Sequence, residues 1–260
     1  MFRQAIRRII RHFGFDVVRI QTQRVFPPDF SAQDVETINS VLPFTMTGPD
    51  RILAVIQSIR YLLRAGIPGG IVECGVWRGG SMMAAALALL QCGATDRDLF
   101  LFDTFEGMTK PSALDISYSN DPALVRFARL KKTDDLAAWC DASLEEVRNN
   151  LLATGYNSER LHFVKGKVEE TIPDSAPEKI ALLRLDTDWY ESTQHELLHL
   201  YPRLSPGGVL IIDDYGHWLG ARKATDEYFS QNNIHILLNR IDYTGRIAVK
   251  PVGSAEGKGN

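Results

Sequence analysis

The apolar positions of this chain follow two spacings that alternate along its length. From Pro49 to Gly66 they recur every three to four residues, which predicts a helix that ends at the glycine. Short unbroken apolar runs predict buried strands at residues 71–74, 99–102, 161–164, 180–185 and 209–212. Further helices are expected at 82–90, 143–152, 190–201 and 221–230, and further extended segments at 234–238 and 246–249. This alternation predicts an α/β fold with a doubly wound parallel sheet, covered by helices on both faces.

Three stretches fall outside the alternation. Residues 1–40 predict an N-terminal helical extension interrupted at Pro27-Pro28, and residues 251–260 a flexible Gly-rich tail. Residues 107–141 are polar and too long for a simple connection. We therefore expect a lid at 107–141, inserted in a single domain of residues 41–250.

The first helix of the extension is amphipathic. Its apolar face carries Phe2, Ile6, Ile9, Ile10 and Phe13, and arginines lie mostly on the other face. Such a helix, within residues 1–20, can lie on an anionic membrane surface, or it can cap the domain or a partner subunit. We favour capping, which predicts a homo-oligomer.

Composition narrows the class of protein. The 260 residues are 45% hydrophobic and 23% charged, which is typical of a soluble globular protein. A formal net charge of -3 argues against a nucleic-acid binder that neutralises many phosphates. The three cysteines are too scattered for a disulfide framework or a four-cysteine metal site. No apolar run approaches the ~20 residues that span a bilayer. We expect a cytoplasmic protein, peripheral to the membrane only if its N-terminal helix binds there.

Acidic residues end four of the five predicted strands: Glu73, Asp103, Asp186 and the pair Asp213-Asp214. Ligands of open α/β sheets bind beyond the carboxyl ends of the strands. Because packing alone does not require acids at these ends, their recurrence is the main functional signal of the sequence.

The turn after the first strand, residues 73–81, reads Glu-Cys-Gly-Val-Trp-Arg-Gly-Gly-Ser. Glycines allow a tight turn and close approach to a ligand. A dinucleotide-binding loop would need a glycine where Trp77 stands, and a Gly-Lys-Ser/Thr phosphate loop is also absent. The acid before the turn suits a cationic ligand, such as the ammonium group of S-adenosylmethionine, and Asp103 can accept hydrogen bonds from ribose hydroxyls. A tight strand–helix turn without a ligand also uses glycines, so this alternative stays open.

A second group of acids predicts a metal site. Asp186 and Asp188 are two residues apart, so an extended chain points both side chains the same way. Asp213 and Asp214 follow the next strand, and converging carboxylates repel one another unless they bind a proton or a cation. Oxygen ligands select Mg²⁺, with Mn²⁺ as a possible substitute. The alternative is structural: Asp188 caps the next helix, and the pair starts a turn.

Residues 195–199, His-Glu-Leu-Leu-His, match the His-Glu-x-x-His pattern of zinc proteases. They lie in a predicted helix between two parallel strands, and no third ligand follows at a protease-like spacing. We therefore interpret His195 and His199 as solvated histidines.

Several segments resemble the macrocin O-methyltransferase (TylF-type) family. The most specific are residues 184–190, Arg-Leu-Asp-Thr-Asp-Trp-Tyr, and residues 212–218, Ile-Asp-Asp-Tyr-Gly-His-Trp. The resemblance covers roughly residues 42–250. It implies a Rossmann-like class I methyltransferase fold, whose seven-stranded, mostly parallel sheet has an antiparallel seventh strand. It also implies Mg²⁺-dependent transfer of a methyl group from S-adenosylmethionine to a sugar hydroxyl, often on glycosylated natural products.

The resemblance further implies roles for individual residues. Asp186, Asp213 and Asp214 correspond to metal ligands, and Asp188 to the general base. The expected cofactor positions are Met46, Thr47, Glu73, Gly75, Trp77, Gly80, Ser81, Asp103, Gly166, Lys167 and Asp186. His217 is a rival base that we expect to contact the substrate instead.

Three other functions stay open. A catechol-type O-methyltransferase would keep cofactor and metal and accept an aromatic diol. An NAD-dependent oxidoreductase shares the fold class, but the glycine spacing disfavours it. A non-catalytic relative would not need the full set of acids.

Overall fold

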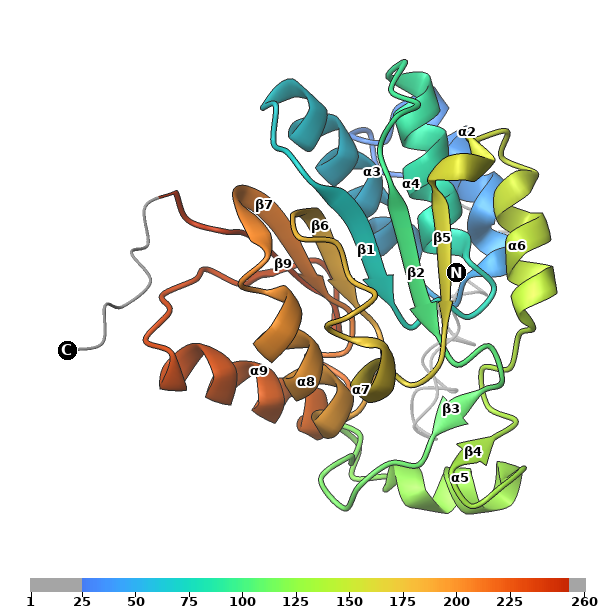
Figure 1. Cartoon of the computed structure of the whole chain (residues 1–260), viewed down its shortest axis with the longest axis vertical. Helices are drawn as coiled ribbons and strands as arrows, with labels where there is room; N and C mark the ends of the chain where they lie inside the picture. The colour runs from blue at the N-terminus through green and yellow to red at the C-terminus, as the bar shows by residue number, and fades with distance from the viewer. Residues whose placement is uncertain (1–24, 253–260) are drawn as a thin grey trace, which may run out of the picture.

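The computed structural model of the chain describes residues 25–252 (Figure 1). The amphipathic helix expected near residues 2–13, its proposed membrane or subunit contacts, and most of the Gly-rich tail lie outside the described residues. Within residues 25–252, no helix has the length and apolar character needed to cross a membrane.

A seven-stranded sheet forms the centre of the fold. Its strand order is β5-β2-β1-β6-β7-β9-β8. The parallel strands are β1 (Gly70–Cys74), β2 (Leu99–Asp103), β5 (Leu161–Lys165), β6 (Ile180–Leu185) and β7 (Leu204–Ile212). β9 (Arg246–Val249) runs antiparallel to both β7 and β8 (Asn239–Arg240). The predicted Rossmann-like fold with an antiparallel last strand is confirmed.

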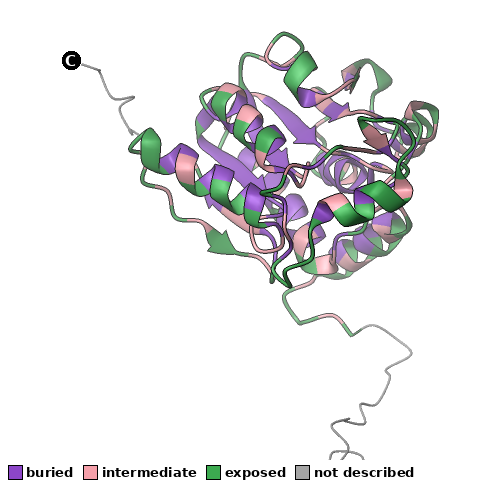
Figure 2. Cartoon of the chain, turned by 90° about the horizontal axis from the view of Figure 1, so that it is seen from below, coloured by how far each residue is buried: buried purple, intermediate pink, exposed green. Residues whose placement is uncertain are grey.

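Helices cover both faces of the sheet, as expected (Figure 1). One face carries α2 (Ala32–Val41), α3 (Pro49–Arg64), α4 (Gly80–Gln91) and α6 (Leu144–Leu152). The other carries α7 (Val168–Thr171), α8 (Tyr190–Leu200) and α9 (Leu219–Gln231). Short 3-10 turns, η1 (Leu42–Phe44) and η2 (Ser158–Arg160), precede α3 and β5. Figure 2 shows the strands buried between these two layers.

Alternation along the strands divides the core in two. Leu182 and Ile211 pack in the cluster on the α2–α4 face, whereas Leu183 and Leu210 pack in the cluster on the α7–α9 face. The same alternation decides to which face the side chain at each strand end belongs.

Two boundaries differ from expectation. The extended segment predicted at 234–238 is wrong, since those residues form no strand and β8 begins at Asn239. Ile234, Ile236 and Leu238 pack against the α7–α9 core instead, which explains an alternating apolar pattern without a pairing partner. The boundary expected between residues 40 and 41 falls inside α2, which ends at Val41.

The lid, residues 107–141, lies beyond the carboxyl ends of the strands (Figure 1). It contains a two-stranded ribbon of β3 (Met108–Thr109) and β4 (Leu136–Ala137), and the helix α5 (Ala123–Leu130). Its Asp115 is buried and accepts a hydrogen bond from the backbone nitrogen of Tyr190, at 2.8 Å. The lid is thereby docked on the N-terminus of α8.

Candidate active site

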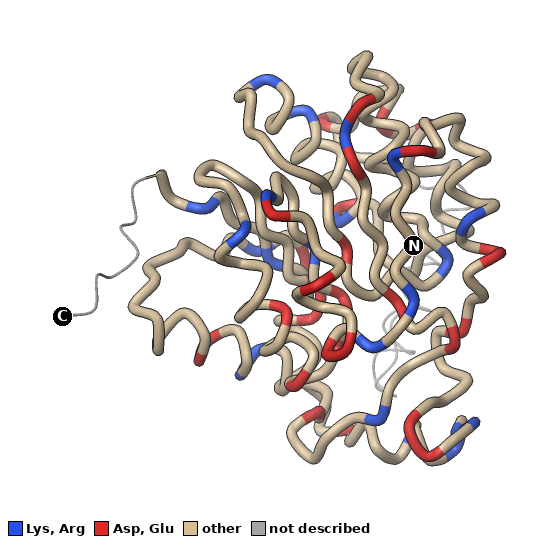
Figure 3. The backbone as a smooth tube through the Cα atoms, in the orientation of Figure 1, with Lys and Arg blue, Asp and Glu red and all other residues tan. Residues whose placement is uncertain are grey.

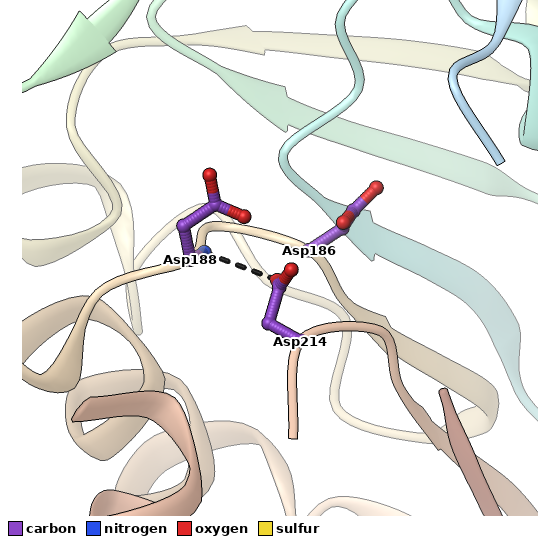
Figure 4. Close-up of side chains that lie close together, drawn as sticks. All are labelled: Asp186, Asp188 and Asp214. Atoms are coloured by element: carbon purple, nitrogen blue, oxygen red, sulfur yellow. Dashed lines mark hydrogen bonds between the residues drawn. The ribbon is translucent and has the colours of Figure 1, made fainter. Parts of the chain in front are cut away.

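Three carboxylates meet where β6 and β7 end: Asp186, Asp188 and Asp214 (Figure 4). Acidic residues gather along this edge of the sheet (Figure 3). We call these three carboxylates the acid cluster. One oxygen of each lies within 4.8 Å of the others. β6 and β7 are parallel neighbours, so their carboxyl ends bring these residues to one edge of the sheet. Among the described residues, this is the one group of three or more potential ligand side chains close enough to share a metal ion.

The backbone at Asp188 turns its carboxylate toward its neighbours. Asp188 has φ of 70°, in the left-handed region that side chains disfavour. Its backbone nitrogen donates to Asp214 Oδ2 at 3.2 Å, and the nitrogen of Trp189 donates to the carbonyl of Thr187 at 2.8 Å. Asp188 does not cap α8, because the first free nitrogen of that helix is bound by Asp115 of the lid. The structural alternative for Asp188 is therefore not observed.

Burial makes the acid cluster hard to ionise. It raises the pKa of Asp186 and of Asp214 well above the ordinary value, and the charges of neighbouring aspartates add to this effect. Burial likewise raises the pKa of Asp188 to about 7, although a hydrogen bond with Asp214 opposes the rise. Carboxylates that repel in this way retain a proton or bind a cation.

Arg184 compensates a second set of acids, which we call the arginine-paired acids: Glu73 and Asp213. Its guanidinium donates to Glu73, to Asp213 Oδ1 at 2.5 Å and to Asp186 Oδ2 at 2.7 Å. Glu73 and Arg184 are direct neighbours in the β1–β6 register. Although burial alone would lower it, the surrounding carboxylates raise the pKa of Arg184 well above its ordinary value. Sequence reasoning missed this residue, whose signal was a lone charge within a buried apolar strand.

Asp213 lies beside the acid cluster and not within it. Its carboxylate accepts hydrogen bonds from Arg184 and from Arg51 of α3. The residues predicted as metal ligands are therefore divided: Asp186 and Asp214 face a common space with Asp188, whereas Asp213 faces two arginines. Its role as a ligand stays a prediction.

A cavity of about 260 Å³ opens over these acids. It brings together residues that are far apart in the sequence, including Met46, Thr47, Glu73, Trp77, Ser81, Arg126, Trp139, His217 and Tyr243. The second oxygen of Glu73, Oε2, is buried and has no hydrogen-bond partner among residues 25–252. Burial raises the pKa of Glu73 to about 7 in spite of Arg184. A cationic ligand group would satisfy this oxygen and favour the ionised form.

A second, smaller cavity of about 60 Å³ has Gly75 in its lining. Asp103, Gly166, Lys167 and the start of the lid line it, and Asp186 borders both cavities. The two cavities together contain nearly all residues expected to bind the cofactor.

Asp103 has a role that its predicted contact with ribose did not include. Its carboxylate accepts hydrogen bonds from the backbone nitrogens of Val76 at 2.7 Å, Trp77 at 3.0 Å and Phe105 at 2.8 Å. Burial outweighs these bonds and raises its pKa. Asp103 thus holds the turn after β1, and its ribose contact stays a prediction.

Two of the predicted glycines are required by close packing. A Cβ on Gly75, which has φ of 78°, would lie 2.0 Å from the carbonyl oxygen of Asp186. A Cβ on Gly80 would lie 2.7 Å from the carbonyl oxygen of Phe44. Gly80 therefore lets the segment after η1 approach α4, which places Met46 and Thr47 at the larger cavity.

His217 borders the larger cavity and is half-buried. Its Nδ1 lies 3.3 Å from the hydroxyl oxygen of Tyr243. Burial and the charge of Arg51 lower its pKa, so its imidazole is neutral at pH 7. Nearby, Trp139, Trp189 and Trp218 pack on one another with ring centroids 5.1–6.1 Å apart. Trp189 and Trp218 are thus packing residues that join the lid to the domain.

The zinc-protease pattern at residues 195–199 does not form a metal site among the described residues. The rings of His195 and His199 lie 4.4 Å apart, and His195 Nε2 is 3.0 Å from the carbonyl oxygen of Ile172. Both histidines are half-buried, whereas Glu196 is completely buried and points into the domain.

Comparison with known proteins agrees with this geometry. The chain is 36% identical over 201 residues to the 8-demethyl-8-(2,3-dimethoxy-alpha-L-rhamnosyl)-tetracenomycin-C 4'-O-methyltransferase of Streptomyces olivaceus, covering 77% of this chain and 73% of that protein. It is 34% identical over 215 residues to the mycinamicin III 3''-O-methyltransferase of Micromonospora griseorubida, covering 83% and 80%. The structure of the O-methyltransferase NovP superposes with a TM-score of 0.70 and 31% identity, covering 80% and 83%.

The family profile named Macrocin-O-methyltransferase (TylF) matches residues 11–249, nearly the whole chain. The match includes every residue predicted for the cofactor, the metal and catalysis. This chain therefore belongs to the macrocin-O-methyltransferase (TylF) family of S-adenosylmethionine-dependent O-methyltransferases.

Proposed function

We propose that this protein transfers a methyl group from S-adenosylmethionine to a hydroxyl group of a sugar or glycosylated small molecule, with Mg²⁺ bound by its aspartates. The observation that carries the proposal is the larger cavity. It holds an acid with an unpartnered oxygen, Glu73, beside three carboxylates of which, among residues 25–252, only Asp186 pairs with an arginine. The activities named for the two curated relatives, both on glycosylated compounds, support a sugar acceptor.

The residues around Gly75 fit S-adenosylmethionine. The cofactor supplies a methyl group activated by a sulfonium charge. We assign its ammonium group to Glu73 Oε2, which has no other partner among residues 25–252. Met46, Thr47 and Ser81 border the same cavity, whereas Asp103, Gly166 and Lys167 border the smaller one. This division fits a ligand with an amino-acid end and a nucleoside end.

The acid cluster fits a divalent cation, because it offers oxygen ligands whose mutual repulsion a cation relieves. Asp186 and Asp214 would hold Mg²⁺, with Mn²⁺ as a substitute. Asp213 would become a third ligand if a bond to the ion replaced its hydrogen bond with Arg51. The ion would supply Lewis acidity to an acceptor hydroxyl.

Asp188 acts as the general base in this proposal. Its carboxylate takes the proton of the acceptor hydroxyl as the acceptor oxygen bonds to the methyl carbon. The carbon–sulfur bond breaks at the same time, and its electron pair stays on sulfur. His217 is neutral and contacts the acceptor, and the docked lid excludes water from the site. The homo-oligomer and the cytoplasmic location expected from the sequence stay predictions.

The proposal is tested first by calorimetric titration of S-adenosylhomocysteine, which keeps the ammonium group. We expect Glu73→Gln to weaken binding by about tenfold or more, since it removes a charged hydrogen bond. Glu159→Gln is the matched control, because Glu159 is exposed next to the start of β5, at the opposite end of that strand from the acids. This control should bind as the wild type does.

Turnover with sugar and with catechol acceptors, with Mg²⁺ and with a chelator, then tests the acceptor and the metal. Wild-type protein that does not bind S-adenosylhomocysteine would contradict the proposed activity. Turnover of catechols alone would replace the sugar acceptor by an aromatic diol, and turnover in the chelator would remove the metal from the proposal.

A further inference from the structure

Glu196, the central acid of the His-Glu-x-x-His pattern, is turned into the domain. It is fully buried on α8. Its Oε1 accepts a hydrogen bond from the hydroxyl of Thr187 at 2.9 Å. Thr187 is the residue between Asp186 and Asp188, so this bond joins α8 directly to the loop that carries two members of the acid cluster.

Alternation along β6 explains why Thr187 reaches α8. Arg184 and Asp186 belong to the α2–α4 face of the sheet, where Arg184 meets Glu73 and Asp213. Leu183 and Leu185 belong to the opposite face, and Thr187 continues their series. The acids of the loop and its hydroxyl group therefore point to opposite sides.

This loop has a conformation that needs a restraint. Asp188 lies in the left-handed region, at φ of 70°, although it has a Cβ. The hydrogen bond from Thr187 to Glu196 restrains Thr187, the residue immediately before Asp188. Conformations of this kind persist where the surrounding structure holds them.

Packing alone does not explain an acid at position 196. Burial raises the pKa of Glu196 well above its ordinary value, and the thiol of Cys74 lies close enough to interact with it. An apolar side chain would fill the same space without the cost of burying a polar group.

We infer that Glu196 is a positioning residue: through Thr187 it holds the loop in the shape that directs Asp186 and Asp188 toward Asp214. This role rests on the proposed function, because positioning matters only if the acid cluster binds a cation. It also gives a role to the His-Glu-x-x-His pattern at residues 195–199, which the proposed methyltransferase activity does not otherwise use.

Two matched pairs of variants test the inference. Thr187→Val and Glu196→Leu each remove one partner of the hydrogen bond and keep a similar volume. Thr187→Ser keeps the hydroxyl donor, and Glu196→Gln keeps the acceptor oxygen. We expect the first pair to weaken binding of Mg²⁺ alone, measured by calorimetry, by about 10- to 100-fold. The second pair should stay within about threefold of the wild type.

Hydrogen exchange of the peptide that spans residues 185–189 supplies a readout that needs no metal. We expect faster exchange in Thr187→Val and Glu196→Leu, with exchange elsewhere unchanged. Uniformly faster exchange in all peptides would indicate a merely structural role and overturn the inference. So would a Glu196→Gln protein that behaves like Glu196→Leu, or a Thr187→Val protein that keeps wild-type exchange. A wild-type protein without Mg²⁺ affinity would contradict the proposed metal site. The inference that Glu196 positions the acid cluster for a cation would then fail too, whatever the pattern of hydrogen exchange.

Discussion

Two sets of acids lie at the same edge of this sheet, and they differ in what balances their charge. Glu73 and Asp213 each accept hydrogen bonds from Arg184, and Asp103 accepts them from three backbone nitrogens. The acid cluster has much less: Asp188 and Asp214 mainly face each other, and Arg184 reaches only Asp186. Burial of an acid is therefore not by itself evidence for a metal site. A lack of opposing charge is evidence for a metal site, because carboxylates without such charge favour a proton or a cation.

The strongest test of this comparison removes the charge of Asp188. We expect Asp188→Asn to lower turnover by about 10²- to 10⁴-fold, as for loss of a general base. Its affinity for Mg²⁺, measured by calorimetry, should change little, whereas Asp213→Asn or Asp214→Asn should weaken it. The exposed Asp174 gives a matched control, Asp174→Asn, with wild-type turnover and affinity.

Loss of Mg²⁺ affinity in Asp188→Asn would make Asp188 a ligand instead of a base. In that case the three residues of the acid cluster are the ligand set, and Asp213 belongs to Arg51 and Arg184 alone.

A second test breaks the compensated set. Arg184→Met removes the guanidinium and leaves the arginine-paired acids buried with less opposing charge. We expect the free energy of unfolding, measured with urea, to fall by about 3–5 kcal/mol. Arg222→Met is the control, because Arg222 is exposed and its ion pair with Asp226 spans one helical turn. That variant should stay within about 1 kcal/mol of the wild type. Equal stability of the two variants would show that Arg184 does not balance the acids.

The sequence predicted which acids reach this edge but not how their charges are balanced. Unbroken apolar runs fixed the strand ends, so Glu73, Asp103, Asp186 and Asp214 were placed by topology alone. Most of the partners of these acids are distant in the chain. Arg51 comes from α3, and the nitrogens of Val76 and Trp77 reach Asp103 only because the turn after β1 folds over β2.

The loop at Asp188 and the docking of the lid show the same limit. The letters Asp-Thr-Asp do not by themselves predict a left-handed residue, and the contacts of this loop with Asp214 and with α8 are tertiary ones. Asp115 lay in a stretch interpreted only as polar and loop-like, and its contact with α8 is a tertiary one. Local patterns therefore predicted the elements and the positions of the acids, while compensation and loop shape required the folded chain.

The smallest expected effect concerns pH and isolates the contribution of Asp188 without any loss of the fold. In a metal-free buffer, the native acid cluster binds protons more tightly than the unfolded chain does, because burial raises the pKa of Asp188 to about 7. Between pH 5 and 8 the native state therefore holds more protons than the unfolded state, and stability falls as pH rises. We expect Asp188 to contribute a fall of about 2–3 kcal/mol over this window, measured by urea unfolding.

Other groups also titrate in this window. Burial raises the pKa of Glu73 to about 7, which makes stability fall with pH, and burial lowers the pKa of His199 and of His217, which makes stability rise with pH. The informative quantity is thus the difference between the wild type and Asp188→Asn, in which the contributions of Glu73 and of the histidines cancel. The wild type should lose more stability than the variant as pH rises. Saturating Mg²⁺ should reduce that loss, since the ion replaces the proton that the acid cluster would otherwise retain. If both proteins show the same pH dependence in the absence of metal, the charges of the acid cluster are balanced after all, and the distinction between the two sets of acids fails.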